Sequence, residues 1–335
     1  MTKQGAILVV GPSWVGDMVM AHSLCQILLK NHPDWAIDIL APAWTLPLLT
    51  RMPGVRQGIA IPLGHGELGL GARFRLGQTL RGCYDRVIVL PNSLKSALVP
   101  FFAAIPIRTG FLGELRWGLL NDIRRLDKKR LPRTVDRFVA LGGLPEAPLP
   151  DPLPLPRLRA SASQGREILN RCGLPDDDAP LLALCPGAEY GPAKRWPMDH
   201  FVSLVHAKAR MGWRMVVLGS AKETSLGDEI VANMGLQAIN LAGRIGLEEA
   251  LDVLACVSAV VTNDSGLMHV AAALDRPGVV VFGSSDPAHT PPLGGRMVVL
   301  SVGLECAPCF KRFCPKDHYD CLRRITPEMV LAHLV

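Results

Sequence analysis

The sequence predicts an α/β protein of two domains, each with a parallel β-sheet, that face each other across a cleft. Short apolar runs alternate with helical patterns in both halves of the chain, as they do in βαβ units. A proline-rich segment separates the two halves. The length of 335 residues agrees with two domains, because a single hydrophobic core stops growing at about 250–300 residues.

The first half opens with a β-rich run, a glycine-containing loop and an apolar helical pattern. We expect strands at residues 6–10, 34–41 and 86–90, and a helix over residues 18–29. Residues 64–82 are rich in glycine and poorly periodic, so a loop or an irregular helix is expected there.

Residues 145–156, PEAPLPDPLPLP, contain six prolines in twelve positions. Proline has no backbone N–H to donate, so this segment is expected to be an extended, semi-rigid connector. We place the domain boundary just after it, which gives an N-terminal domain of residues 1–158 and a C-terminal domain of residues 159–335.

The second half repeats the pattern with clearer signals. The expected strands cover residues 181–185, 213–218, 259–262 and 277–282, of which 277–282 is the last clear one. The expected helices cover residues 197–211, 222–234 and 247–255, with a further helix after the TNDSG loop. Ligands of open α/β sheets bind at the carboxyl ends of the strands, so the loops that follow strands are the candidate sites.

Composition excludes several classes of protein. A hydrophobic content of 49% is too high for a disordered chain. The longest uncharged apolar stretch, residues 96–107, contains two prolines and is shorter than the ~20 residues of a membrane span. The N-terminus reaches Gly11 and Pro12 too early for a secretory leader, so we expect a cytoplasmic protein. The net charge of +6 favours an anionic ligand or surface and does not favour nucleic acid.

The first candidate site is the loop GPSWVGD at residues 11–17. It matches neither GxGxxG nor the P-loop pattern, yet backbone N–H groups at such a turn can hold an anion or a sugar hydroxyl. Asp17 is either a helix-start carboxylate favoured by the helix dipole or a general base that takes a proton from an attacking hydroxyl. Ser13, Trp14 and Gly16 are the candidate acceptor contacts in this loop.

The second candidate site is the loop PGAEYGPAKRWP at residues 186–197, which brings Gly187 and Lys194 to the end of a strand. Lys194 is either a cation that neutralises a diphosphate leaving group or a solvated surface lysine. Two basic residues, Lys194 and Arg195, in a glycine- and proline-containing loop at this edge favour the functional interpretation.

The third candidate site, TNDSGLMH at residues 262–269, leads from a strand into a helix. Asp264 and Ser265 are favourable N-cap residues, and the free N–H groups from Gly266 onward suit a phosphate. Asp264 is interpreted as a cap or a loop-ordering residue beside that phosphate. His269, one turn along, is either a ligand-binding residue or a half-buried histidine.

Two further strand–helix junctions of the second half extend this pattern to a nucleotide pocket. Glu223, in GSAKE, can accept hydrogen bonds from ribose hydroxyls, and Ile245, in GRI, can pack on a purine. Each signal is weak alone, and the prediction depends on their places at successive junctions of one domain.

Residues 108–137 hold nine basic residues interleaved with four acidic ones. This segment either contacts an anionic acceptor or an anionic membrane surface, with Arg108 and Arg124 as candidate contacts, or it forms a solvated pair of helices.

The C-terminal segment holds four of the nine cysteines, spaced C-x2-C-x4-C-x6-C, with His318 nearby. In a reducing compartment such a cluster is typical of a structural zinc or iron site, and free thiols or a labile disulfide are the alternatives. The four residues are Cys306, Cys309, Cys314 and Cys321. The other five cysteines are scattered and are expected to be small buried hydrophobic residues.

Several of these motifs together resemble one family. The segments GPSWVGDMVM, PGAEYGPAKRWP, TNDSGLMHVAAAL, FGSSDPAHTPPL and CAPCFKRFCPKDHYDCL resemble the lipopolysaccharide heptosyltransferases of glycosyltransferase family 9. This resemblance implies a GT-B fold, in which two Rossmann-like domains have the active site between them. The C-terminal domain is then expected to bind the nucleotide sugar and the N-terminal domain the acceptor.

The resemblance also implies the reaction. It is an inverting transfer of L-glycero-D-manno-heptose from ADP-heptose to the heptosylated Kdo2-lipid A inner core of lipopolysaccharide, with no metal required for the chemistry. The acceptor implies peripheral contact with the cytoplasmic face of the inner membrane, and no nucleic acid partner. Asp17 would deprotonate the acceptor, and Lys194 with the Ser265–Gly266 helix start would stabilise the departing diphosphate. His269 matches a family histidine with a binding role.

Three alternatives stay open at this point. An enzyme of the same family could act on Kdo2-lipid A before the first heptose is added. A sugar-nucleotide epimerase of the same architecture would need no macromolecular acceptor, and a non-enzymatic membrane-surface module would use the basic segment alone.

Overall fold

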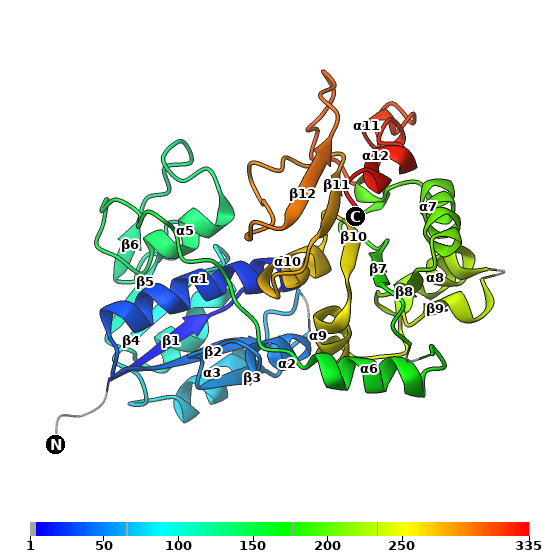
Figure 1. Cartoon of the computed structure of the whole chain (residues 1–335). Coiled ribbons are helices and arrows are strands. Elements are labelled where there is room, and N and C mark those ends of the chain that lie inside the picture. The colour runs from blue at the N-terminus through cyan, green and yellow to red at the C-terminus, as the bar shows by residue number, and fades with distance from the viewer. Residues whose placement is uncertain (1–4, 65, 176, 233, 335) are drawn as a thin grey trace. The chain divides into compact units, whose positions relative to one another are not determined.

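The computed structural model describes residues 5–64, 66–175, 177–232 and 234–334. The chain forms two compact units, residues 1–158 (unit 1) and residues 159–335 (unit 2), whose elements are labelled in Figure 1. Each unit contains a six-stranded sheet in which all paired strands are parallel, which confirms the α/β fold class. The division between the units lies at the end of the proline-rich segment.

In unit 1 the strand order is β3-β2-β1-β4-β5-β6. The strands are β1 (Ala6–Val10), β2 (Ala36–Pro42), β3 (Gln57–Ile61), β4 (Arg86–Val89), β5 (Ile107–Phe111) and β6 (Asp122–Arg124). The helices are α1 (Val15–Asn31), α2 (Leu46–Leu49), α3 (Leu70–Thr79), α4 (Leu98–Phe102) and α5 (Thr134–Ala140). Helix α1 packs against α5, and α3 packs against α4. Every residue of β1 is buried, which explains its continuous apolar run.

The expectation of a loop or irregular helix at residues 64–82 is wrong for its second part, because α3 is a regular helix of ten residues. Glycine in the segment weakens the helical pattern, but Gly77 allows α3 and α4 to touch. A Cβ atom at Gly77 would lie 2.5 Å from Cβ of Phe102. Gly77 thus lowers the helix propensity of α3, but it permits close packing of α3 against α4.

The proline-rich segment is attached to unit 1. Gln26 in α1 donates a hydrogen bond from Nε2 to the carbonyl of Leu155 at 2.6 Å, and the backbone N–H of Arg157 donates to Nδ1 of His22 at 3.0 Å. These contacts hold the connector along α1 before unit 2 begins.

In unit 2 the strand order is β12-β11-β10-β7-β8-β9. The strands are β7 (Leu181–Cys185), β8 (Arg214–Val217), β9 (Ala238–Asn240), β10 (Ala259–Asn263), β11 (Gly278–Phe282) and β12 (Met297–Ser301). The helices are α6 (Ala162–Arg171), α7 (Met198–Arg210), α8 (Thr224–Val231), α9 (Leu247–Cys256), α10 (Gly266–Ala273), α11 (Asp320–Arg323) and α12 (Pro327–Leu331). Residues 277–282, the last clear strand of the sequence, correspond to β11, and a further strand that was not predicted, β12, pairs with it along its whole length.

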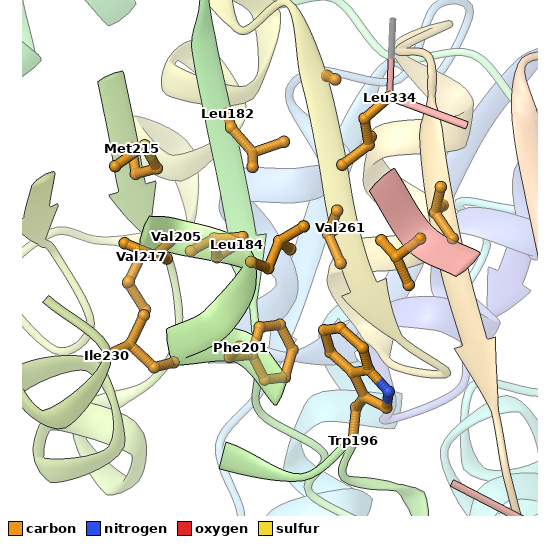
Figure 2. Packing of buried hydrophobic residues seen from close by; sticks show 14 of the residues in the cluster. Leu182, Leu184, Trp196, Phe201, Val205, Met215, Val217, Ile230, Val261 and Leu334 are labelled. Atoms are coloured by element: carbon orange, nitrogen blue, oxygen red, sulfur yellow. The ribbon is translucent and has the colours of Figure 1, made fainter. Parts of the chain in front are cut away.

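The core of unit 2 packs α7 and the C-terminal helices against the sheet, as Figure 2 shows for Leu184, Phe201 and Val261. Trp196 belongs to this core, with its ring 4.9 Å from that of Phe201 and its Nε1–H donating to the carbonyl of Ile325 at 2.7 Å. Trp196 therefore anchors the end of the loop that follows β7.

Both sheets reverse their direction of winding once. The reversal lies between β1 and β4 in unit 1 and between β7 and β10 in unit 2. At such a switch point the flanking loops diverge and leave a crevice at the carboxyl ends of the strands, where ligands bind. The three candidate loops of the sequence follow β1, β7 and β10.

Candidate functional site

The buried side chain of Asn263 joins the loops after β7 and β10. Cys185 and Thr262 are partners in the sheet, so the two loops start at the same level. Asn263 donates from Nδ2 to the carbonyl of Pro186 at 2.6 Å and accepts from the backbone N–H of Trp196 at 2.9 Å. It therefore fixes both ends of the loop that carries Lys194. The sequence reasoning missed this residue.

Lys194 forms an ion pair with Asp264, with 2.5 Å between Nζ and Oδ2. The same carboxylate oxygen accepts a hydrogen bond from the hydroxyl of Ser285, also at 2.5 Å. The side chains of Lys194 and Asp264 are only 18% and 5% exposed, so Lys194 is not a freely solvated lysine. The ammonium group also lies 5.2 Å from the centre of the Tyr190 ring. Asp264 thus orders the loop and orients the cation, and Ser285 is a second contact that the sequence did not reveal.

The N-terminus of α10 lies directly after this ion pair. Ser265 is the N-cap residue, but its side chain makes no capping hydrogen bond, and its hydroxyl lies 3.3 Å from that of Thr262. The helix begins at Gly266. An uncapped helix start has N–H donors and a partial positive charge, and both favour a phosphate group.

His269, one turn into α10, is buried. Burial lowers its pKa to about 4; the positive charge of Lys194 also lowers the pKa, whereas the negative charge of Asp264 opposes the shift. The ring is therefore neutral at pH 7, and it is more deeply buried than the half-buried histidine that the sequence suggested. Its binding role remains a prediction.

The pKa of His269 can be measured by following its ring protons by NMR. We expect titration near pH 4, well below the ordinary value of 6.5. Between these values the unfolded chain binds the proton and the folded chain does not, so the stability contribution of His269 is lost as the pH falls from 6.5 toward 4. The variant His269→Gln identifies the signal by its absence, and a midpoint near 6.5 would contradict the burial.

The residues expected at the nucleotide pocket lie at neighbouring strand ends. Glu223 is buried, and its Oε2 accepts from the backbone N–H and the hydroxyl of Ser220 at 2.7 and 2.6 Å. A Cβ atom at Gly187 would lie 2.7 Å from Cδ of Glu223, so only glycine fits there without a shift. Glu223 thus closes the turn after β8, and its predicted ribose contact stays a prediction. Ile245 is half-buried in the loop after β9.

The C-terminal segment supports the loop that carries Lys194. The backbone N–H of Ala193 donates to the carbonyl of Arg312 at 3.1 Å, and the Tyr190 hydroxyl donates to that of Phe310 at 2.7 Å. A Cβ atom at Gly191 would lie 2.7 Å from the oxygen of Arg312. The segment therefore contributes to the shape of the site through its backbone.

The prediction of a metal site at the four cysteines is not supported. They line one cavity of about 20 Å³ together with His318, so the spacing correctly indicates a cluster. Within the part of the chain that the structure describes, however, no three cysteine, histidine or acidic residues are arranged to hold a metal ion. Burial and the neighbouring Cys306, Cys309 and Cys314 raise the pKa of the Cys321 thiol to about 11. All nine cysteines are free thiols.

In unit 1, the loop after β1 carries Asp17 in the first turn of α1. Gly11 precedes it at a point of close packing, since a Cβ atom there would lie 2.6 Å from Cε of Met18. Trp14 is exposed, Gly16 is buried, and Ser13 accepts from Nε1 of Trp44 at 3.3 Å through its carbonyl oxygen.

Trp44, which follows β2, is also exposed. Two exposed indoles thus lie at the strand edge that carries Asp17, and such rings provide apolar faces for sugar rings. The sequence reasoning did not single out Trp44, because its contact with the first loop depends on strand order.

The basic segment at residues 108–137 is not a pair of helices, because it contains β5, β6 and α5. Arg116 is fully buried, and Arg108 donates to the carbonyls of Leu119 and Ile105 at 2.7 and 2.6 Å. Arg124 forms an ion pair with Asp122 at 2.8 Å. Arg108 and Arg124 thus have structural partners, and their predicted contact with an acceptor remains untested.

Known proteins resemble this chain along nearly its whole length. The model of glycosyltransferase family 9 (heptosyltransferase) matches residues 73–320. Lipopolysaccharide heptosyltransferase 2 of Escherichia coli K12 is 46% identical over 338 residues, which cover 98% of this chain and 97% of that protein. The Salmonella typhimurium LT2 protein of the same name is 48% identical, with the same coverage. The solved structure of E. coli ADP-heptose lps heptosyltransferase II has a TM-score of 0.88 and 44% identity, and covers 98% of this chain and 97% of its own.

Proposed function

Because the chain belongs to glycosyltransferase family 9, the heptosyltransferases, we propose that it transfers L-glycero-D-manno-heptose from ADP-heptose to an inner-core acceptor of lipopolysaccharide. The observation that carries this proposal is the oriented Lys194 beside the N-terminus of α10, at the switch point of unit 2. A fixed cation and free N–H donors at one strand edge form a site for a diphosphate.

Unit 2 holds the donor in this proposal. Lys194 and the first N–H groups of α10 bind the diphosphate, and they stabilise the negative charge that develops on its oxygen as the bond to the sugar breaks. Asp264 keeps the ammonium group of Lys194 in place through their ion pair. The positive charge that a divalent metal supplies in other transferases is here supplied by the chain, so the proposed reaction requires no metal.

Unit 1 supplies the base. The acceptor hydroxyl oxygen forms a bond to the anomeric carbon while its proton passes to the carboxylate of Asp17. The carbon–oxygen bond to ADP breaks on the opposite face, and its electron pair leaves with the diphosphate. One displacement inverts the anomeric configuration. The exposed rings of Trp14 and Trp44 provide apolar surfaces for the acceptor sugars.

We propose that the acceptor is the heptosylated Kdo2-lipid A inner core and that the chain associates peripherally with the cytoplasmic face of the inner membrane. Full-length relatives named heptosyltransferase 2 are 46–48% identical to this chain, whereas a full-length relative named heptosyltransferase 1 is 31% identical. This difference supports transfer of the second heptose over transfer of the first. No specific observation favours an epimerase or a non-enzymatic surface module.

A thermal-shift experiment with ADP separates the enzyme from a surface module. Saturating ADP, at about 100 times its Kd, is expected to stabilise the ligand-binding unit by about 2.7 kcal/mol through mass action. Incubation with ADP-heptose alone should leave the sugar nucleotide unchanged apart from slow hydrolysis. Absence of stabilisation would contradict the donor site, and an isomerised sugar nucleotide would indicate an epimerase.

A further inference from the structure

Helices α3 and α4 present an apolar outer surface that the fold does not cover. On the inner side, Val99 of α4 belongs to one hydrophobic cluster with Leu8 and Val10 of β1, and Leu76 of α3 packs against this cluster. On the outer side, Phe74 is 49% exposed and Phe101 is 42% exposed. We define the α3–α4 surface by its exposed apolar side chains and two adjacent cations: Leu70, Phe74, Phe101, Ile107, Arg75 and Arg108.

Ring contacts make this surface continuous. Phe74 meets Phe102 edge to face at 5.4 Å, and Phe102 meets Phe101 at 5.8 Å. The guanidinium carbon of Arg108 lies 5.8 Å from the centre of the Phe101 ring. Leu70 and Phe74 are four residues apart on α3 and so lie on one side of the helix. Exposed aromatic residues in contact with one another, from two different helices, are characteristic of an interaction site.

The charged side chains next to this surface are mainly positive. Arg108 is half-buried beside Phe101, whereas Arg73 is buried and Arg86 pairs with Asp122 at 3.7 Å. The acid that precedes α3 is the exposed Glu67. Arg75 and Arg81 are exposed. A positively charged border around aromatic side chains is complementary to an anionic lipid surface, which offers an apolar interior beneath negative headgroups.

The position of α3 fits this partner. In a parallel α/β unit the connecting helices run antiparallel to the strands, so the start of α3 lies toward the carboxyl edge of the sheet, the edge that carries Asp17. Arg73 is buried and donates from Nε to the carbonyl of Leu68 at 2.6 Å, which fixes the segment of chain that leads into α3.

Within the described residues, no helix has both the length and the apolar character that a membrane span requires.

We propose that the α3–α4 surface docks unit 1 onto a membrane that contains anionic phospholipid, with Phe74 and Phe101 entering the interface and Arg75 contacting the headgroups. This inference rests on the proposed function, in which the acceptor is a lipid. It centres the membrane contact on α3 and α4, and Arg108 is the residue of the basic segment 108–137 that belongs to the defined surface. It assigns the docking to lipid, and not to a protein or a second copy of the chain.

The test is binding of the full chain to vesicles. The wild type should bind vesicles of phosphatidylglycerol and phosphatidylcholine more strongly than vesicles of phosphatidylcholine alone. The double variant Phe74→Ser/Arg75→Gln should bind at least about tenfold more weakly, since one cation alone accounts for about fivefold. The matched control is Arg210→Gln/Met211→Ser, which removes an exposed apolar and basic pair at the end of α7 and should bind like the wild type.

Several outcomes would overturn the proposal. The first is equal vesicle binding by the wild type and the α3 double variant, and the second is no preference of the wild type for anionic vesicles. The third is that the wild type binds no vesicles but associates with itself, and that the α3 double variant abolishes this self-association. Melting temperatures close to that of the wild type would show that both double variants are folded. Transfer to an inner-core acceptor freed of its acyl chains should be the same in all three proteins. If the wild type does not transfer heptose to this acceptor, the proposed function is contradicted. The vesicle experiment then still tests the docking surface by itself.

Discussion

The variant Asp17→Asn is expected to bind ADP-heptose normally and to transfer heptose about 10²–10⁴-fold more slowly than the wild type. The amide has nearly the same shape as the carboxylate but cannot take the proton of the attacking hydroxyl. Because the proposed donor contacts lie in unit 2, donor affinity should not change. The measurements are the turnover number and the Kd for ADP-heptose.

A matched control is available for this substitution. Asp34 is an exposed aspartate of unit 1, after the end of α1, and Asp34→Asn should show normal turnover. A helix-start role alone would give Asp17→Asn a small loss of stability and little loss of rate. Near-normal turnover by Asp17→Asn would therefore remove Asp17 as the base.

The variant Lys194→Ala is expected to weaken donor binding and to lower the turnover number by about 10²–10³-fold. It removes a preorganised cation that stabilises the leaving diphosphate, and single donors of this kind contribute effects of that size. It also leaves the carboxylate of Asp264 buried without its ion-pair partner, which costs stability. A change in acceptor affinity alone would contradict the placement of Lys194.

A second substitution separates the two effects. In Lys194→Ala/Asp264→Asn the buried charge is removed together with its partner, so the melting temperature should rise relative to Lys194→Ala. The transfer rate should stay low, because the cation is still missing. Recovery of both stability and rate in the double variant would show that Lys194 has a purely structural role.

The sequence predicted the buried central strands well. Residues 6–10 and 181–185 coincide with β1 and β7, because strands covered on both faces are continuous apolar runs that begin and end sharply. The edge strands β3, β6, β9 and β12 and the inner strand β5 were not predicted. Of these, β6 and β9 have three residues each and include polar side chains, so neither length nor period distinguishes them from loops.

The candidate site was predicted residue by residue but not as a network. Lys194 and Asp264 were selected separately, and their ion pair depends on β7 and β10 being neighbours, which the sequence does not state. Asn263 and Ser285 were missed for the same reason. The charge count at residues 108–137 was misleading, because the sequence does not distinguish a buried arginine, such as Arg116, from a solvated one.

The most direct test of the account is a transfer assay with ADP-heptose and two inner-core acceptors, Kdo2-lipid A with and without its first heptose. The account predicts one added heptose, with inverted anomeric configuration, on the heptosylated acceptor and little or none on the other. Transfer to unheptosylated Kdo2-lipid A in preference, or no transfer to either acceptor, would contradict it.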